Sequence, residues 1–152
     1  MKTIDLLRQQ APVLAQRIET TPKSELRKVA AAVAQAAVRR TGLSDPVISE
    51  ALEELMASFD VDENLQRRVQ AVAEDLDERY FTLKEPLEDR EDAGKTDPEV
   101  MLAFSRARAA SSVAEAFGYD IGEAAGSVGY EAFISTDDES YLIEALEKAL
   151  AK

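Results

Sequence analysis

The sequence predicts an all-α protein, and two observations support that prediction. Apolar residues recur at intervals of three and four along nearly all of the 152 residues, and no stretch alternates with the period of two typical of half-buried strands. Capping residues directly followed by proline, which are typical of helix starts, occur at Thr21-Pro22, Asp45-Pro46 and Asp97-Pro98. The length fits one domain of ordinary size, so we expect residues 1–152 to form a single-domain bundle of six to seven helices.

Three helices are expected in the first sixty residues. An apolar stripe covers residues 4–18, where Pro12 predicts a kink or a restart because proline has no amide hydrogen to donate. An alanine-rich helix is expected over residues 22–41, ended by Gly42 as its C-cap. The third helix is expected over residues 46–58.

The middle of the chain predicts two longer helices. Asp62 is the expected N-cap of the fourth helix, which Pro86 ends. Residues 85–96 carry five acidic side chains without a strong period, which indicates an exposed loop. The fifth helix, over residues 97–117, is apolar on two opposite sides, so we expect it to be the central buried helix of the bundle.

Two further helices complete the prediction. The sixth begins at about Asp120, and the seventh is expected to begin with a capping box formed by Thr136 and Glu139. Three glycines at helical spacing in the sixth helix predict a close contact between two helix backbones: Gly122, Gly126 and Gly129.

Composition and charge exclude several functions. The chain contains neither cysteine nor histidine, which removes disulfides, thiolate zinc sites and Ser-His or Cys-His catalysis. A net charge of −12 argues against general binding to nucleic acids and to anionic membranes. The chain has no run of 18 apolar residues and no secretory leader pattern at its start, so we expect a cytoplasmic protein.

The charges are unevenly distributed along the chain. Residues 1–40 contain eight Lys or Arg and three Asp or Glu, whereas residues 41–152 contain ten and twenty-seven. An acidic surface near the end of the fourth helix, with the outward-facing Phe81 as an apolar anchor, therefore suits a basic protein partner. The expected partner-binding residues share this surface: Asp75, Glu78, Phe81, Glu85, Glu88, Asp89, Glu91 and Asp92.

These observations favour a non-enzymatic binding domain with no catalytic residues and no cofactor. Immunity proteins that neutralise nuclease toxins have the same physical character, since they are small, acidic and often helical; the analogy is one of size and charge. A structural or oligomeric role is an alternative, in which the alanine-rich helix over residues 22–41 provides a face for self-association.

An enzymatic alternative rests on four carboxylates, Glu50, Glu53, Glu74 and Asp77. Their ExxE…ExxD spacing resembles the magnesium-binding pattern of the all-α nucleoside triphosphate pyrophosphohydrolases, the MazG-like fold. That resemblance implies a Mg²⁺ ion that holds a triphosphate and positions a water for attack. Helical geometry argues against it, because both pairs lie toward the polar sides of their helices, whereas a metal site in a bundle needs ligands that converge inward.

Two arginines are expected in an apolar environment, Arg106 and Arg108 within the fifth helix. Each must have a carboxylate or carbonyl partner, and we favour structural ion pairs over an anion-binding pocket. The segment that begins at Phe104 (FSRARA), together with Tyr130-Glu131-Ala132, resembles a pattern in an uncharacterised family of bacterial all-helical proteins, which implies no function.

Overall fold

The computed structural model describes residues 2–57, 62–87 and 97–152, and these ranges contain eight α-helices and no strand. The all-α class is confirmed, and the helix number is slightly higher than predicted. None of the described helices combines the length and the apolarity that a membrane span requires. The elements in chain order are α1 (Thr3–Gln10), α2 (Pro12–Thr20), the 3₁₀ turn η1 (Lys23–Glu25), α3 (Leu26–Thr41), α4 (Pro46–Ala57), α5 (Glu63–Lys84), the 3₁₀ turn η2 (Glu85–Leu87), α7 (Pro98–Glu115), α8 (Ile121–Thr136) and α9 (Glu139–Leu150).

The higher helix number arises at Pro12, where the expected restart is found. Ala11 leaves the helical conformation and separates α1 from α2. The amide groups of Val13 and Leu14 then lack partners within α2, and both donate to one carboxylate oxygen of Glu139, at 3.1 and 3.2 Å. A residue of α9 therefore caps the N-terminus of α2.

Short-range capping ends or begins most other helices as expected. Gly42 adopts φ 68° and closes α3, and the Asp62, Asp97 and Asp120 carboxylates accept hydrogen bonds from the first turns of α5, α7 and α8. Asp45 does the same at the start of α4.

The predicted capping box of the last helix is wrong. Thr136 is the final residue of α8, and its hydroxyl donates to the Ala132 carbonyl. Asp138 is the N-cap of α9 instead and accepts from the Tyr141 amide, because Asp138 directly precedes the helix. Glu139 is thereby left available to cap α2.

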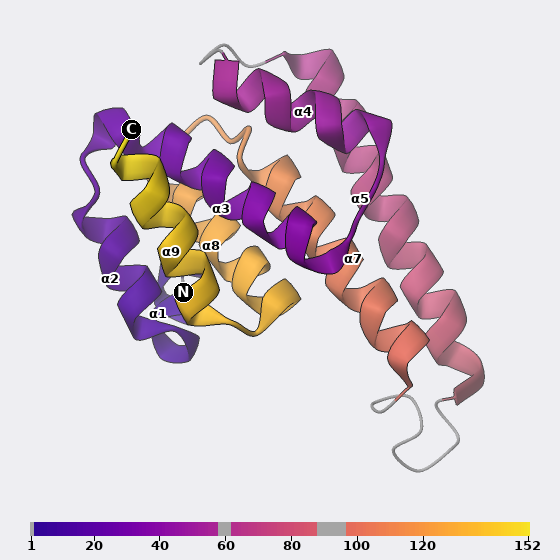
Figure 1. Ribbon diagram of the computed structural model, residues 1–152. Coiled ribbons are helices and arrows are strands. Elements are labelled where there is room, and N and C mark those ends of the chain that lie inside the picture. Colours follow the sequence, from indigo (N-terminus) through magenta and orange to yellow (C-terminus); the bar gives the residue numbers. More distant parts are fainter. Residues whose placement is uncertain (1, 58–61, 88–96) are drawn as a thin grey trace.

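Helices α3, α7 and α8 form the centre of the fold, and each packs against the other two (Figure 1). Helices α1, α2 and α9 cover α8 and α3, and α4 and α5 lie on the α7 side. Small side chains fill the contacts between the central helices, which lets their backbones approach closely. The buried small residues are Ala30, Ala31, Ala34, Ala36 and Ala37 in α3, Ala107, Ala109, Ala110, Ser112 and Ala114 in α7, and Ala124, Ala125 and Ala132 in α8.

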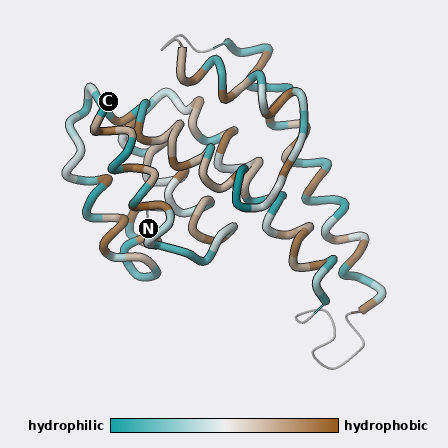
Figure 2. Tube along the Cα trace, viewed as in Figure 1, coloured by the Kyte–Doolittle hydropathy of each residue, from teal (hydrophilic) through white to brown (hydrophobic). Residues whose placement is uncertain are grey.

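The expected central helix, α7, is buried mainly in its C-terminal part. Near its start, Met101 and Leu102 are exposed. This part of α7 lies beside the end of α5, and the two helices extend away from the other helices (Figure 1). Hydrophobic and hydrophilic residues alternate in short bands along the helices, as amphipathic packing requires (Figure 2).

Two arginines connect the ends of α3 and α7, which run antiparallel. Arg27 of α3 donates to the carbonyls of Ala116 and Gly118 just after α7, both at 3.2 Å. Arg106 of α7 donates to the Thr41 carbonyl at the end of α3, at 3.0 Å. Each guanidinium therefore satisfies carbonyl groups that the last turn of a helix leaves without partners.

The predicted backbone contact at the glycines of α8 is found at Gly126, whereas Gly129 makes room for the ends of two side chains. A Cβ atom on Gly126 would lie 3.2 Å from Ile4 Cβ, and one on Gly129 would lie 2.7 Å from Ile18 Cδ1 and 2.8 Å from Leu7 Cδ2. Gly122 has no such neighbour from another helix. Helix α8 therefore packs directly against α1 and α2.

Substitution of Gly129 with alanine tests this contact. The added methyl group overlaps two buried side chains, and we expect the free energy of unfolding to fall by about 1 kcal/mol, since overpacking costs more than the helix propensity gained. The matched variant Gly122→Ala has room for its methyl group and should be as stable as the unmodified chain, or more so. Urea unfolding measures both, and an unchanged midpoint for Gly129→Ala would contradict the packing.

Candidate partner-binding surface

The outer face of α5, together with Glu85 at the start of η2, carries the described part of the predicted acidic surface. Asp75, Glu78, Phe81 and Glu85 are all exposed, and 59% of Phe81 remains accessible to solvent. Phe81 lies outside the buried stripe of α5, which runs through residues such as Val69 and Ala73. The expected outward position of this ring is confirmed. The other expected residues lie outside the described residues: Glu88, Asp89, Glu91 and Asp92.

A hollow of about 390 Å³ adjoins Phe81 between α5, α7 and α8. Tyr80 lines it, and its ring centroid lies 5.1 Å from that of Phe81 and 5.2 Å from that of Phe104, the second pair in an edge-to-face arrangement. Met101 precedes Phe104 by one helical turn and is 53% exposed, so the same side of α7 continues the apolar surface. The residues that line the hollow are Asp77, Tyr80, Phe81, Phe104, Arg108, Tyr130, Glu131 and Ile134.

Arg108 of α7, which also lines the hollow, connects this helix to α5 and α8. Its guanidinium forms ion pairs with Asp77 of α5 and, at 3.1 Å, with Glu131 of α8. All three side chains are partly buried, with at most 35% of any of them exposed. The structure therefore shows structural ion pairs at Arg108, and a carbonyl partner at Arg106.

Burial and charge act in opposite directions on these groups. Burial raises the pKa of the Glu131 carboxyl above its usual value, although the Arg108 guanidinium acts to lower it. Burial also acts to lower the pKa of Arg108, but the hydrogen bonds and charges of Asp77 and Glu131 together keep it above its usual value. Arg108 therefore remains a cation that is shared between the carboxyl groups of Asp77 and Glu131.

The four carboxylates of the magnesium alternative are not brought together. Glu50 forms an ion pair with Arg68 at 3.1 Å, whereas Asp77 pairs with Arg108. Glu74 accepts from Gln70, and Glu53 is exposed on α4. Among the described residues, no three carboxylates are grouped so that they could hold a metal ion. The geometry gives this alternative no support.

The sequence did not identify the aromatic hollow beside Phe81. Tyr80 and Phe104 both belong to apolar stripes, which predicted core positions, but they are only half buried. The available signal was the spacing of Met101, Phe104 and Arg108, which places all three on one side of α7. Pairing of that side with the acidic face of α5 depends on the tertiary structure.

Comparisons with models of protein families, with curated proteins and with solved structures found no match. The resemblance carried by Phe104 and Tyr130-Glu131-Ala132 therefore stays a prediction.

Substitution of Arg108 with glutamine tests the electrostatics of this group. Loss of the cation removes the effect that lowers the pKa of Glu131, so that pKa should rise further. When the folded state raises the pKa of a carboxyl group, the contribution of that group to the free energy of unfolding is lost as the pH rises through the pKa. We therefore expect Arg108→Gln to lower the free energy of unfolding by about 2 kcal/mol at pH 7, which lies between the values for exposed and buried ion pairs. At pH 4 the decrease should be smaller.

A carbon-13 NMR titration of the Glu131 carboxyl and urea unfolding at the two pH values measure these effects. The matched variant Arg67→Gln removes an exposed cation from α5 and should change neither the pKa of Glu131 nor the free energy of unfolding. An equal loss of stability at pH 4 and pH 7, or a fall in the pKa of Glu131, would exclude this account of the ion pairs.

Proposed function

We propose that this protein is a non-enzymatic binding domain that docks a basic protein on the surface around Phe81. The observation that supports the proposal most directly is an exposed aromatic side chain within an acidic rim, beside a hollow that is itself lined by aromatic rings. Large aromatic side chains in such surroundings dominate binding energy at protein interfaces, and a charged rim provides orientation and rate.

The position of this surface favours contact with a partner. Phe81 lies near the end of α5, in the part of the α5–α7 pair that extends away from the other helices (Figure 1). The hollow next to it offers about 390 Å³, enough for one large side chain of the partner. Lysine and arginine suit this position, because they can stack on Phe104 while their charge lies near Asp77 and Glu131. Tyr80 already has the ammonium group of Lys84 over its ring, 5.6 Å from the centroid.

The net charge of −12 favours the same partner class over long range. Electrostatic steering raises the association rate for a cationic protein and falls with ionic strength. Immunity proteins of nuclease toxins combine acidic surfaces with basic partners in this way, and we extend that analogy to this chain as part of the proposal. Bacterial origin and a cytoplasmic location belong to the same proposal.

Substitution of Phe81 with serine tests the anchor. The protein and its variant are immobilised and used to capture basic proteins from a lysate of the native host. The dissociation constant of a captured partner is then measured by calorimetry. We expect Phe81→Ser to weaken binding at least about tenfold, as for an interface hot spot, while circular dichroism stays unchanged. Equal affinity of the two proteins would show that the partner uses another surface.

Charge-reversal variants distinguish the effect of local charges on binding from the effect of the net charge of the protein. The pair Asp75→Lys and Glu78→Lys should slow association and reduce its dependence on salt. The control pair Glu53→Lys and Glu123→Lys makes the same change in net charge on α4 and α8, away from Phe81, and should retain most of the affinity. Identical association rates for the two double variants would contradict docking at the α5 surface.

A further inference from the structure

A second hollow lies between α3, α9 and the end of α4, and it shares no lining residue with the hollow beside Phe81. Its volume is about 440 Å³, within the range of pockets that bind small molecules. Part of its lining belongs to α3, the alanine-rich helix for which a self-association face is the alternative prediction.

The floor of this hollow is apolar. Ala32 and Ala36 of α3 lie opposite Ala145 and Ala149 of α9, and Met56 at the end of α4 is 51% exposed at its edge. The small alanine side chains leave the space open between the two helices. Tyr141 borders the hollow as well, and its hydroxyl donates to the Ala36 carbonyl at 3.1 Å, which fixes the ring.

The rim carries charge opposite to that of the whole protein. Four of the thirteen lining residues are Lys or Arg, whereas Glu144 is the single acidic one. Lys148 forms an ion pair with Glu144 at 3.0 Å, and Lys28 donates to the Lys152 carbonyl at 2.9 Å. In a chain with a net charge of −12, such a concentration of cations around an apolar hollow calls for an anionic occupant.

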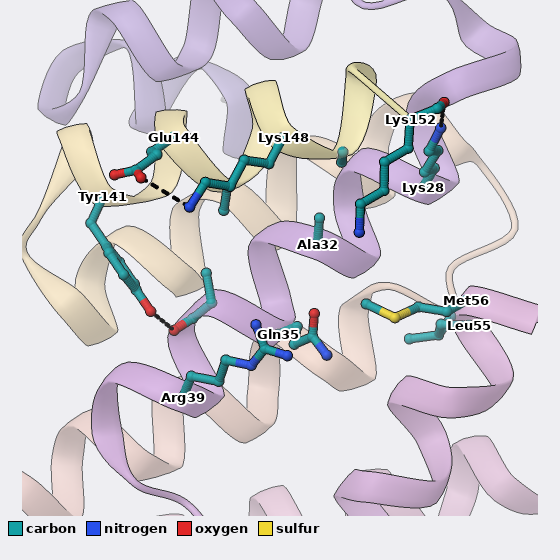
Figure 3. A pocket seen from close by; sticks show the side chains of 13 residues that line it. Lys28, Ala32, Gln35, Arg39, Leu55, Met56, Tyr141, Glu144, Lys148 and Lys152 are labelled. Atoms are coloured by element: carbon teal, nitrogen blue, oxygen red, sulfur yellow. Dashed lines mark hydrogen bonds and ion pairs between the residues drawn. The ribbon is translucent and has the colours of Figure 1, made fainter.

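Three further donors in this hollow have no polar partner among the described residues. They are the Arg39 guanidinium, the Gln35 amide and the Lys152 ammonium group. Figure 3 shows Arg39 and Gln35 side by side on α3, with Lys152 reaching toward the same hollow from the end of the chain. Donors from two separate segments therefore surround one apolar space.

We propose that this hollow binds a small amphipathic anion, with a carboxylate or phosphate group held at Arg39 and Lys152 and an apolar body against the alanine floor and Met56. The guanidinium of Arg39 offers a planar fork that matches both anionic groups. The apolar floor excludes a free inorganic ion as the best ligand, because such an ion would leave that surface exposed. The site is independent of the protein-docking surface around Phe81.

Calorimetric titration with decanoate, decyl phosphate and decanol tests this proposal. We expect decanoate or decyl phosphate to bind at least tenfold more tightly than decanol, which has the same apolar body without the charge. The anion that binds more tightly identifies the natural headgroup as carboxylate or phosphate. Amide chemical-shift changes should concentrate in α3 and α9.

Three variants locate the site. Arg39→Gln should weaken binding of the preferred anion about tenfold without unfolding the protein, since Arg39 is exposed and its guanidinium has no hydrogen bond or ion pair with another described residue. Arg67→Gln and Phe81→Ser lie elsewhere and should leave the affinity unchanged. The proposal is overturned if decanol binds as tightly as the anions or if Arg39→Gln has no effect on their affinity. It is also overturned if polyglutamate displaces the bound anion at a lower concentration than the free anion itself does, which would indicate an acidic protein as the occupant.

Discussion

Helices α3, α7 and α8 meet through alanine and serine side chains, and the rest of the structure depends on this close approach. On the side of α8 that faces α1 and α2, the missing side chain of Gly129 makes room for the ends of Ile18 and Leu7, so larger side chains from the covering helices reach the centre. Leu7, Leu14 and Leu146 do so from α1, α2 and α9 and are fully buried. A centre made of small residues can therefore be densely packed although few large aromatic side chains lie in the core.

This centre also determines where the charged side chains can lie. Arg27 and Arg106 span the α3–α7 contact and satisfy carbonyl groups at the two helix ends. Arg108, one turn from Phe104, reaches both α5 and α8 because α7 lies between them. The cations at the centre are thus used for structure. Among the described residues, none forms an ion pair with Asp75 or Glu78 on the outer face of α5, which is the charge that the proposed basic partner would complement.

Features that depend on residues close together in the chain are predicted correctly from the sequence. Features that depend on contacts between distant segments are not. The caps at Asp62, Asp97 and Asp120 and the restart at Pro12 follow from local chemistry, as does the outward position of Phe81 on its helix. Glu139 was assigned to a local capping box, but its carboxylate caps α2 across the fold. The aromatic hollow and the basic hollow likewise combine residues from separate helices, which no periodic pattern reveals.

The account is tested most directly by the stability of two variants that make the same change at different depths. Ala110→Leu places a large side chain in the fully buried centre of α7, whereas Ala71→Leu places it on the exposed side of α5. Urea unfolding should show a loss of about 2–3 kcal/mol for Ala110→Leu and almost none for Ala71→Leu. Equal stability of the two variants would contradict a centre built on close helix contacts.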